Sequence, residues 1–195
     1  MSIDSETITL RDGRSVRLGP VRVDDAENYR AYMVTLCGQT PWTGTVPSEV
    51  KDLDKQRERF EKASLRTSGE PGEWILGVFD PETGAVIGDC NWQCTAYERF
   101  GHVASLGIGI LEDWHGVGLG RMLMERAIDA ARADPLVHKI ELGVFSTNTI
   151  ARNLYDSLGF VTEGVRKNAI QPSPGTFQDD VIMGLWLGDS APDKN

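Results

Sequence analysis

Hydrophobic residues recur along this chain at two spacings, and each spacing predicts a different kind of element. Short runs in which apolar residues alternate or cluster between turn formers are typical of β-strands. The first half of the chain contains four such runs, at residues 8–10, 16–18, 74–79 and 85–93. Because Asp12-Gly13 separates the first two and residues 80–84 are turn formers between the last two, the pattern predicts two hairpins.

Between these hairpins, apolar residues are three or four positions apart, as on one face of a helix. Asp24 and Glu27 match a helix-capping pair, and the buried face expected after them consists of Ala26, Tyr29, Met33 and Leu36. Residues 38–47 are rich in turn formers and predict a loop that carries Trp42. Residues 48–65 carry mixed acids and bases around a thin apolar stripe, so we expect a solvated amphipathic helix and not a nucleic-acid surface.

The second half of the chain alternates strands with helices. Leu106, Ile108 and Ile110 alternate with small residues and predict a strand, and a helix follows residues 115–120. The buried face of that helix is expected at Leu119, Met122, Leu123, Ala127, Ala130 and Ala131. A second helix begins at Asn148, a good cap residue, and ends at Gly159. Residues 161–170 and 177–187 predict a final strand pair, so the overall pattern favours an α+β or a mixed-sheet α/β fold.

Composition narrows the class of protein. The chain has 195 residues, a net charge of −9 and a pI near 4.8, which argues against nucleic-acid binding and is compatible with a cationic partner. We expect one domain over residues 1–195, with a core of about residues 6–187 and a polar tail at 188–195. The sequence shows no signal peptide and no long apolar run, and its odd number of cysteines, three, suggests a reducing compartment, so we expect a cytoplasmic protein without a membrane or metal partner.

The turn at residues 115–120, His-Gly-Val-Gly-Leu-Gly, contains the first residues that suggest a ligand-binding site. Glycines between a strand and a helix let main-chain N–H groups point toward a ligand, and the helix N-terminus adds partial positive charge. A pyrophosphate suits such a site, although a tight turn without a ligand is an equal reading of three glycines alone. No Lys-Ser or Lys-Thr follows, as a P-loop requires, and Arg121 stands where the dinucleotide fingerprint needs glycine.

Two segments together resemble the GNAT superfamily of acyl-CoA-dependent N-acyltransferases. Residues 115–120 resemble the family's Q/R-x-x-G-x-G/A loop, with His115 in place of Gln or Arg, and residues 148–160 are similar to its N-x-x-A-x-x-L-Y-x-x-x-G-F segment. A weaker likeness covers residues 6–187, and the C-terminal part is similar to the branch that contains ribosomal-protein N-terminal acetyltransferases. The resemblance implies a central mixed, mostly antiparallel sheet of about seven strands, with helices on both faces.

The resemblance also implies the cofactor site and its ligand. Acetyl-CoA would be the acyl donor, and its pantetheine arm would lie between the strand at residues 108–110 and the strand at residues 142–145, which diverge in this family. An amide of the first strand would also stabilise the oxyanion of the transfer reaction. The implied cofactor-binding residues are Ile108, Gly109, Ile110, His115, Gly116, Val117, Gly118, Leu119, Gly120, Arg121 and Asn148.

Tyr155 is implied as the general acid that protonates the departing thiolate, because a phenol keeps its proton at neutral pH. Helical spacing alone favours a core aromatic at this position. The general base is unassigned: Glu141 and His102 are candidates, and so is a chain of water molecules. The resemblance implies a primary amine as the acceptor, either a small molecule or an amine of a protein or peptide. It would be held by residues of the first two helices, their joining loop and the final strand pair. The acceptor-site candidates are Trp42, Trp92, Tyr97, Glu98, Phe177, Asp179 and Asp180.

Alternatives remain open on the sequence alone. Arg99 and Arg166 would suit an acceptor that carries a carboxylate. A protein that binds acyl-CoA without transferring the acyl group, as a sensor or interaction module, would contain the same two motifs. A nucleotide-binding oxidoreductase is disfavoured by the glycine spacing. The assembly state is also open, and a homodimer is compatible with these observations.

Overall fold

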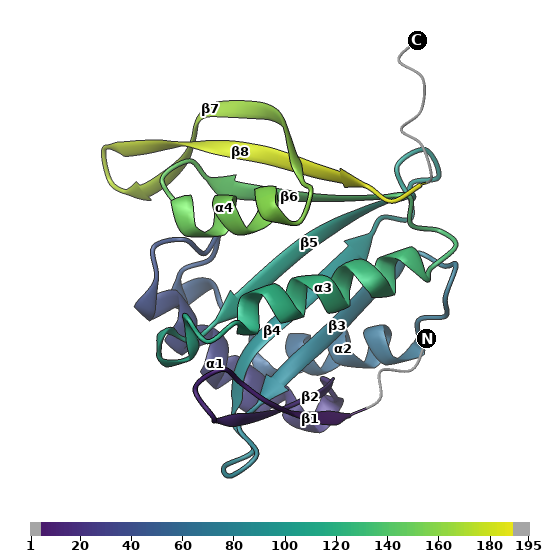
Figure 1. Cartoon of the computed structure of the whole chain (residues 1–195), viewed down its shortest axis with the longest axis vertical. Helices are drawn as coiled ribbons and strands as arrows, with labels where there is room; N and C mark the ends of the chain where they lie inside the picture. Colours follow the sequence, from purple (N-terminus) through teal and green to yellow (C-terminus); the bar gives the residue numbers. More distant parts are fainter. Residues whose placement is uncertain (1–4, 189–195) are drawn as a thin grey trace.

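The computed structural model describes residues 5–188, and their strands form one eight-stranded sheet, compared with the expected number of about seven. The spatial order is β1-β2-β3-β4-β5-β6-β8-β7, and every neighbouring pair is antiparallel except β5 and β6 (Figure 1). The strands are β1 (Glu6–Thr9), β2 (Ser15–Pro20), β3 (Gly72–Phe79), β4 (Val86–Cys94), β5 (Val103–Ile110), β6 (Lys139–Phe145), β7 (Val161–Ser173) and β8 (Thr176–Trp186). The expected mixed, mostly antiparallel sheet is therefore confirmed.

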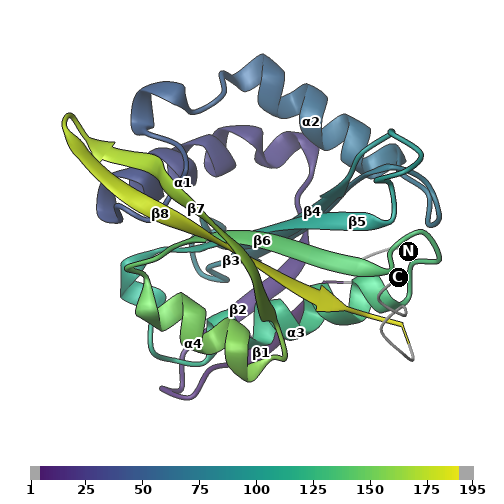
Figure 2. The same ribbon diagram turned by 90° about the horizontal axis from the view of Figure 1, so that it is seen from above.

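Helices cover both faces of the sheet, as expected (Figure 2). One face carries α1 (Ala26–Gln39) and α2 (Leu53–Leu65), and the other carries α3 (Leu119–Arg132) and α4 (Thr149–Ser157). Buried residues accordingly form two clusters, a large one that includes α3 and a smaller one that includes α1 and Phe60 of α2. Since strand side chains alternate between faces, β4 contributes Cys90 and Trp92 to the large cluster and leaves Asp89 and Asn91 facing α1.

The N-terminal helices begin later than the sequence pattern predicts. Residues Val23–Asp25 form a 3₁₀ turn, and the Asp25 carboxylate, not that of Asp24, accepts a hydrogen bond from the Arg22 N–H at 2.8 Å. Likewise, Pro47–Glu49 form a separate turn, and α2 begins after Asp52, whose carboxylate accepts the Lys55 N–H at 2.9 Å. Local charge patterns alone did not distinguish these short turns from the first turn of each helix.

The C-terminal helices follow the prediction closely. Asn148 caps α4 by accepting the Ala151 N–H at 3.2 Å, and Gly159 follows the helix with a φ of 90°. Arg121 and Glu125, four residues apart in sequence, form an ion pair at 3.7 Å on the exposed side of α3. The chain beyond residue 188, which includes most of the expected polar tail, lies outside the described residues. Within residues 5–188, no helix combines the length and apolar character that a membrane span requires.

The sheet opens along one seam, between β5 and β6. These two strands pair only where Val103–Ser105 face Lys139–Glu141. Further along, β5 stays paired with β4 as far as Ile110, and β6 stays paired with β8 as far as Phe145. Figure 1 shows β5 and β6 diverging in this region. The divergence expected between residues 108–110 and 142–145 is therefore present, and it leaves one edge of each strand without a partner strand.

Two glycines of β5 differ sharply in the space around them, which yields a stability prediction. A β-carbon at Gly109 would lie 2.5 Å from the Tyr32 hydroxyl and 2.5 Å from Leu36 Cδ2, whereas at Gly107 its nearest neighbour would be Asn91 at 3.6 Å. We therefore expect Gly109→Ala to lower the free energy of unfolding by about 1–3 kcal/mol, because α1 must move. Gly107→Ala is the matched control and should be neutral or slightly stabilising. Urea denaturation checks this, and equal stability of the two variants would contradict it.

Candidate active site

A cleft of about 1940 Å³ passes along the opening between β5 and β6. Its lining comes from both sides of the sheet. Tyr29 of α1 and Arg59 of α2 belong to one side, and Gly120 of α3 and Tyr155 of α4 belong to the other. The divergence of the two strands therefore joins the two faces of the molecule through a single open path.

The glycine turn lies at one end of this cleft, where His115, Gly116, Gly118, Gly120 and Arg121 are part of the lining. Gly116 and Gly118 have φ values of 76° and 90°, in the left-handed region that favours glycine. The hydrogen bonds of α3 begin with the Met122 N–H, which donates to the Gly118 carbonyl at 3.2 Å. The N–H groups of residues 119–121 therefore precede the helical ladder and are available to an anion.

The side chains around this turn differ in how free they are to contact a ligand. His115 Nε2–H donates to the Ile110 carbonyl at 2.8 Å, so the ring that replaces the family's Gln or Arg is engaged with the end of β5. Arg121 donates to Ser157 Oγ at 2.6 Å and pairs with Glu125. Leu119 is buried and Val117 packs against the core, so any part that they play in ligand binding must come from the main chain.

The free edge of β5 offers main-chain groups to the cleft. Leu111 N–H donates to the Ile87 carbonyl of the neighbouring segment at 2.9 Å. Because main-chain groups alternate in direction along a strand, Gly109 also faces β4, and Leu106, Ile108 and Ile110 face the opening. The Ser105–Glu141 pairing already uses the Leu106 N–H, and the Ile110 carbonyl is bonded to His115. The main-chain groups of Ile108 and the N–H of Ile110 are therefore the groups that an extended ligand can pair with.

Tyr155 lies beside the opening on α4. Its side chain is 7% exposed, it packs against Phe160 with ring centroids 5.9 Å apart, and it lines the cleft. No hydrogen bond to its hydroxyl is present among residues 5–188. Burial raises the pKa of Tyr155 above its ordinary value, and the nearby Cys90 raises it further. The phenol is therefore a proton donor at neutral pH, with a hydroxyl that no protein group occupies.

Asn148 also lines the cleft, at the start of α4. Its side-chain oxygen caps the helix through Ala151, so only the amide nitrogen is left for a ligand.

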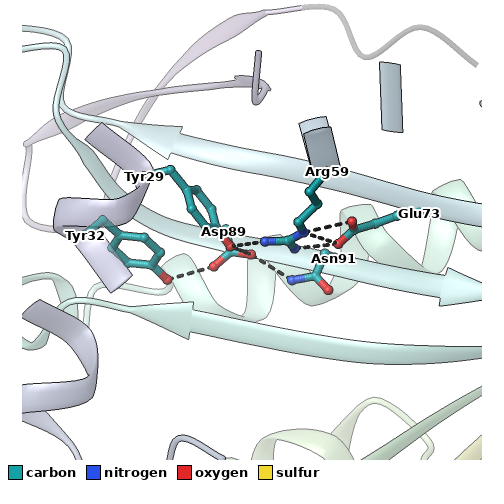
Figure 3. Close-up of polar contacts among 6 residues, drawn as sticks. All are labelled: Tyr29, Tyr32, Arg59, Glu73, Asp89 and Asn91. Atoms are coloured by element: carbon teal, nitrogen blue, oxygen red, sulfur yellow. Dashed lines mark hydrogen bonds and ion pairs between the residues drawn. The ribbon is translucent and has the colours of Figure 1, made fainter. Parts of the chain in front are cut away.

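A buried polar network occupies the α1 and α2 side of the cleft (Figure 3). Asp89 of β4 is 3% exposed and accepts three hydrogen bonds, from Tyr32 Oη at 2.8 Å, Tyr29 Oη at 3.2 Å and Asn91 Nδ2 at 2.8 Å. Burial raises the pKa of the Asp89 carboxyl, although these hydrogen bonds oppose the effect. Burial, followed by the nearby Asp89, likewise raises the pKa of both tyrosines, so the phenols stay protonated as donors.

Arg59 connects this network to α2 and β3. Its guanidinium donates Nε–H to both carboxylate oxygens of Glu73, at 2.9 and 3.1 Å, and its Nη1 donates to Tyr29 Oη at 3.2 Å. The positive charge of Arg59 is thus matched by Glu73, and Asp89 is held by neutral donors only. Beside them, Gln56 is 2% exposed, and its Oε1 has no hydrogen-bond partner among the residues that the structure describes. The cleft wall therefore contains a carboxylate with no directly bonded cation.

Sequence reasoning did not single out this network, because its members come from α1, α2, β3 and β4. One signal was available. Asp89, Asn91 and Gln93 place a polar residue at every second position of a strand whose other residues are apolar or small. Such a stripe on a central strand means that polar groups face a covered surface, where they require partners or a ligand.

Of the acceptor-site residues expected from the sequence, only Trp42 lies at the cleft. Trp42 lines it and packs edge-to-face against Phe145, with centroids 5.9 Å apart. Trp92 was wrongly assigned, because it is 1% exposed in the core on the α3 face, stacked on Trp74. The remaining aromatic and acidic candidates on the turn after β4 and on the β8 hairpin lie outside the cleft lining: Tyr97, Glu98, Phe177, Asp179 and Asp180.

Charged candidates near the final strand pair have partners of their own. Asp179 pairs with Lys167 at 2.8 Å, and Asp180 accepts hydrogen bonds from Arg166. Arg99, like Arg166, is not part of the cleft lining. Neither side chain is therefore placed to bind a carboxylate in the cleft.

Neither base candidate from the sequence lies in the cleft. Glu141 is on β6 where that strand is still paired with β5, and its carboxylate contacts Lys139 Nζ at 3.3 Å. His102 immediately precedes β5, at the opposite end of the strand from the glycine turn, next to His138. Asp89 is the buried acid that the cleft contains instead. No cluster of potential metal ligands is present within residues 5–188.

Comparison with known proteins agrees with this geometry. Residues 40–160 match the model of the acetyltransferase (GNAT) family. The L-amino acid N-acyltransferase MnaT of Escherichia coli (strain K12) is 34% identical over 137 residues, which is 70% of this chain and 69% of the relative. The [ribosomal protein bS18]-alanine N-acetyltransferase of Salmonella typhimurium (strain LT2) is 37% identical over 78 residues, 40% of this chain and about half, 51%, of the relative.

Solved structures share the fold. A GNAT-family acetyltransferase from Streptococcus pneumoniae superimposes with a TM-score of 0.81 at 24% identity, over 88% of this chain and 99% of its own. A putative acetyltransferase from Salmonella typhimurium, described with its cofactor acetyl-CoA, gives a TM-score of 0.74 at 23% identity, over 91% and 98% of the two chains. Family model, relatives and fold agree, and the chain belongs to the acetyltransferase (GNAT) family.

Proposed function

We propose that this protein transfers an acetyl group from acetyl-CoA to a primary amine. The observation that carries the proposal is the opening between β5 and β6. It connects an anion-binding turn and a free strand edge to a buried acid on the other face of the sheet. Direct transfer requires the donor and the acceptor to meet in one place, and this cleft is the path along which they would meet.

The residues on the α3 and α4 side fit acetyl-CoA. The unpaired N–H groups of residues 119–121 would receive a phosphate. The main-chain groups of Ile108 and the N–H of Ile110 would pair with an extended pantetheine arm as with an added strand. The amide nitrogen of Asn148 would donate to the same arm. When bound, acetyl-CoA supplies the acetyl group as an activated thioester.

Tyr155 holds the proton that the departing sulfur needs. Its hydroxyl has no protein partner among the described residues, lines the cleft and keeps its proton because burial raises its pKa. Such a group assists the departure of the thiolate by protonating its sulfur as the carbon–sulfur bond breaks, which gives the free thiol. Tyr155 therefore acts as the general acid in this proposal.

Asp89 faces the acceptor. Its carboxylate is buried in the cleft wall, held by Tyr29, Tyr32 and Asn91, and has no directly bonded cation. An acceptor ammonium group would provide the missing positive charge on binding. Because the amine must lose a proton before it attacks the thioester, the same carboxylate is the group placed to accept that proton.

The proposed activity is tested by thiol release from acetyl-CoA with a panel of amines: amino acids, peptides with a free N-terminal alanine, lysine peptides and polyamines. We expect release that requires one class of amine, because the cleft orients a single acceptor beside Asp89. Binding of acetyl-CoA without release on any amine would contradict the proposal and favour the alternative of a binding protein without transfer activity.

Replacement of Tyr155 tests the general acid. We expect Tyr155→Phe to lower kcat about 10²- to 10⁴-fold, because only the hydroxyl is lost, while the Kd for acetyl-CoA changes less than about threefold. Tyr97→Phe is the matched control, since Tyr97 is 77% exposed and outside the cleft. Steady-state kinetics and calorimetric binding measure the two quantities. A variant with the wild-type kcat would show that Tyr155 is only a packing residue.

Replacement of Asp89 tests the acceptor side. We expect Asp89→Asn to lower kcat/KM for the amine by about 10²-fold or more and to leave acetyl-CoA binding intact, because the lost charge faces the acceptor. Glu98→Gln removes one negative charge outside the cleft and serves as the control. The Kd for acetyl-CoA confirms that each variant is folded. If Asp89→Asn retains full kcat/KM for the amine, Asp89 has no part in acceptor chemistry.

A further inference from the structure

One arginine near the glycine turn has no role in the features described so far. Arg11 lies in the turn between β1 and β2, more than a hundred residues from the glycine turn in sequence. Its side chain is nevertheless at the cleft: a β-carbon built on Gly118 would lie 3.1 Å from Arg11 Nε and 3.4 Å from its Cδ. Figure 1 shows the β1–β2 hairpin beside the start of α3.

The position of Arg11 is set by the hairpin that carries it. The buried Leu10 attaches this hairpin to the core, and its N–H donates to the Arg14 carbonyl at 2.7 Å. Arg14 Nη2 donates to the Asp113 carbonyl at 3.0 Å, and its guanidinium stacks 4.1 Å from the centroid of the Trp114 ring. These contacts attach the β1–β2 turn to the segment that leads into the glycine turn. Arg11 is therefore held over Gly118 by its neighbours.

Arg11 differs from the other basic side chains at this end of the cleft in having no partner. His115 is bonded to Ile110, and Arg121 is bonded to Ser157 and Glu125. Within residues 5–188, Arg11 makes no hydrogen bond or ion pair with any group. A guanidinium at an anion-binding turn can form paired hydrogen bonds with phosphate oxygens, which an engaged imidazole cannot provide.

We propose that Arg11 binds a phosphate group of acetyl-CoA and supplies the side-chain contact that His115 does not make. This inference rests on the proposed function, because it assumes that the cleft binds acetyl-CoA. The phosphate belongs either to the pyrophosphate at the glycine turn or to the 3′-phosphate of the nucleotide, and both present the same oxygens to a guanidinium. The main-chain N–H groups of residues 119–121 and the Arg11 side chain then form one anion site from two distant parts of the chain.

Binding measurements by isothermal titration calorimetry test this without reference to turnover. The ligands are coenzyme A and dephospho-coenzyme A, which lacks only the 3′-phosphate. We expect Arg11→Gln to weaken coenzyme A binding about 5- to 20-fold, in line with the loss of a charge-assisted hydrogen bond that is partly exposed. Arg11→Lys keeps the charge but not the paired geometry and should lose less affinity. The difference between wild type and Arg11→Gln should shrink at high salt.

The control variant is Arg30→Gln, which removes one positive charge from an exposed position of α1 outside the cleft. Equal weakening for both ligands assigns Arg11 to the pyrophosphate, and weakening for coenzyme A alone assigns it to the 3′-phosphate. If wild type binds coenzyme A and Arg11→Gln binds both ligands as tightly as wild type does, the inference is overturned while the proposed function stands. If the wild-type protein binds neither ligand, the proposed function itself fails.

Discussion

The loss of hydrogen bonding between β5 and β6 is the constraint on which the rest of the molecule depends. Main-chain groups inside a sheet are normally paired, and a strand edge in the middle of a sheet is costly unless something else pairs with it. Here each strand keeps its outer neighbour, β4 or β8, so the break is local and the sheet remains one unit. The unpaired edge is then open to the cleft without disrupting the rest of the sheet.

The residues that line the cleft are held in place differently on the two faces of the sheet. On the α3 and α4 face, a large apolar cluster holds the glycine turn and Tyr155 in fixed positions. On the α1 and α2 face, the smaller apolar cluster is supplemented by hydrogen bonds around Asp89. Burial of a carboxylate costs several kcal/mol, and each hydrogen bond to a charged group returns about 1.5–3 kcal/mol. Three neutral donors can hold the charge in place without cancelling it.

At the glycine-turn end of the cleft, main-chain groups and side chains have different roles. The glycine turn provides N–H groups that do not depend on side-chain identity, so the family motif tolerates histidine at position 115. That histidine instead fixes the last carbonyl of β5, which stabilises the junction between strand and turn. Two arginines add side-chain charge at this end, Arg121 from α3 and Arg11 from the distant β1–β2 hairpin.

Sequence by itself predicted most of the elements and the part of the cleft around the glycine turn and Tyr155. Spacing of apolar residues identified the strands and helices, and the glycine turn with Asn148 and Tyr155 could be recognised because these residues lie close together in the chain. Helix starts at residues 26 and 53 were misjudged, since short polar turns and first helical turns share the same local preferences. These features depend on local interactions, which a sequence expresses directly.

Tertiary structure alone decided the part of the cleft around Asp89. Asp89, Tyr29 and Arg59 come from three separate elements and meet only because α1 and α2 pack on β3 and β4. Tertiary structure also decided the positions of Trp92 and Arg11. The register of β4 buries Trp92 in the core on the α3 face, and the β1–β2 hairpin brings Arg11 next to the glycine turn. Strand register and helix packing are set by long-range burial of apolar surface, of which the local pattern showed only the alternation of polar and apolar residues along β4.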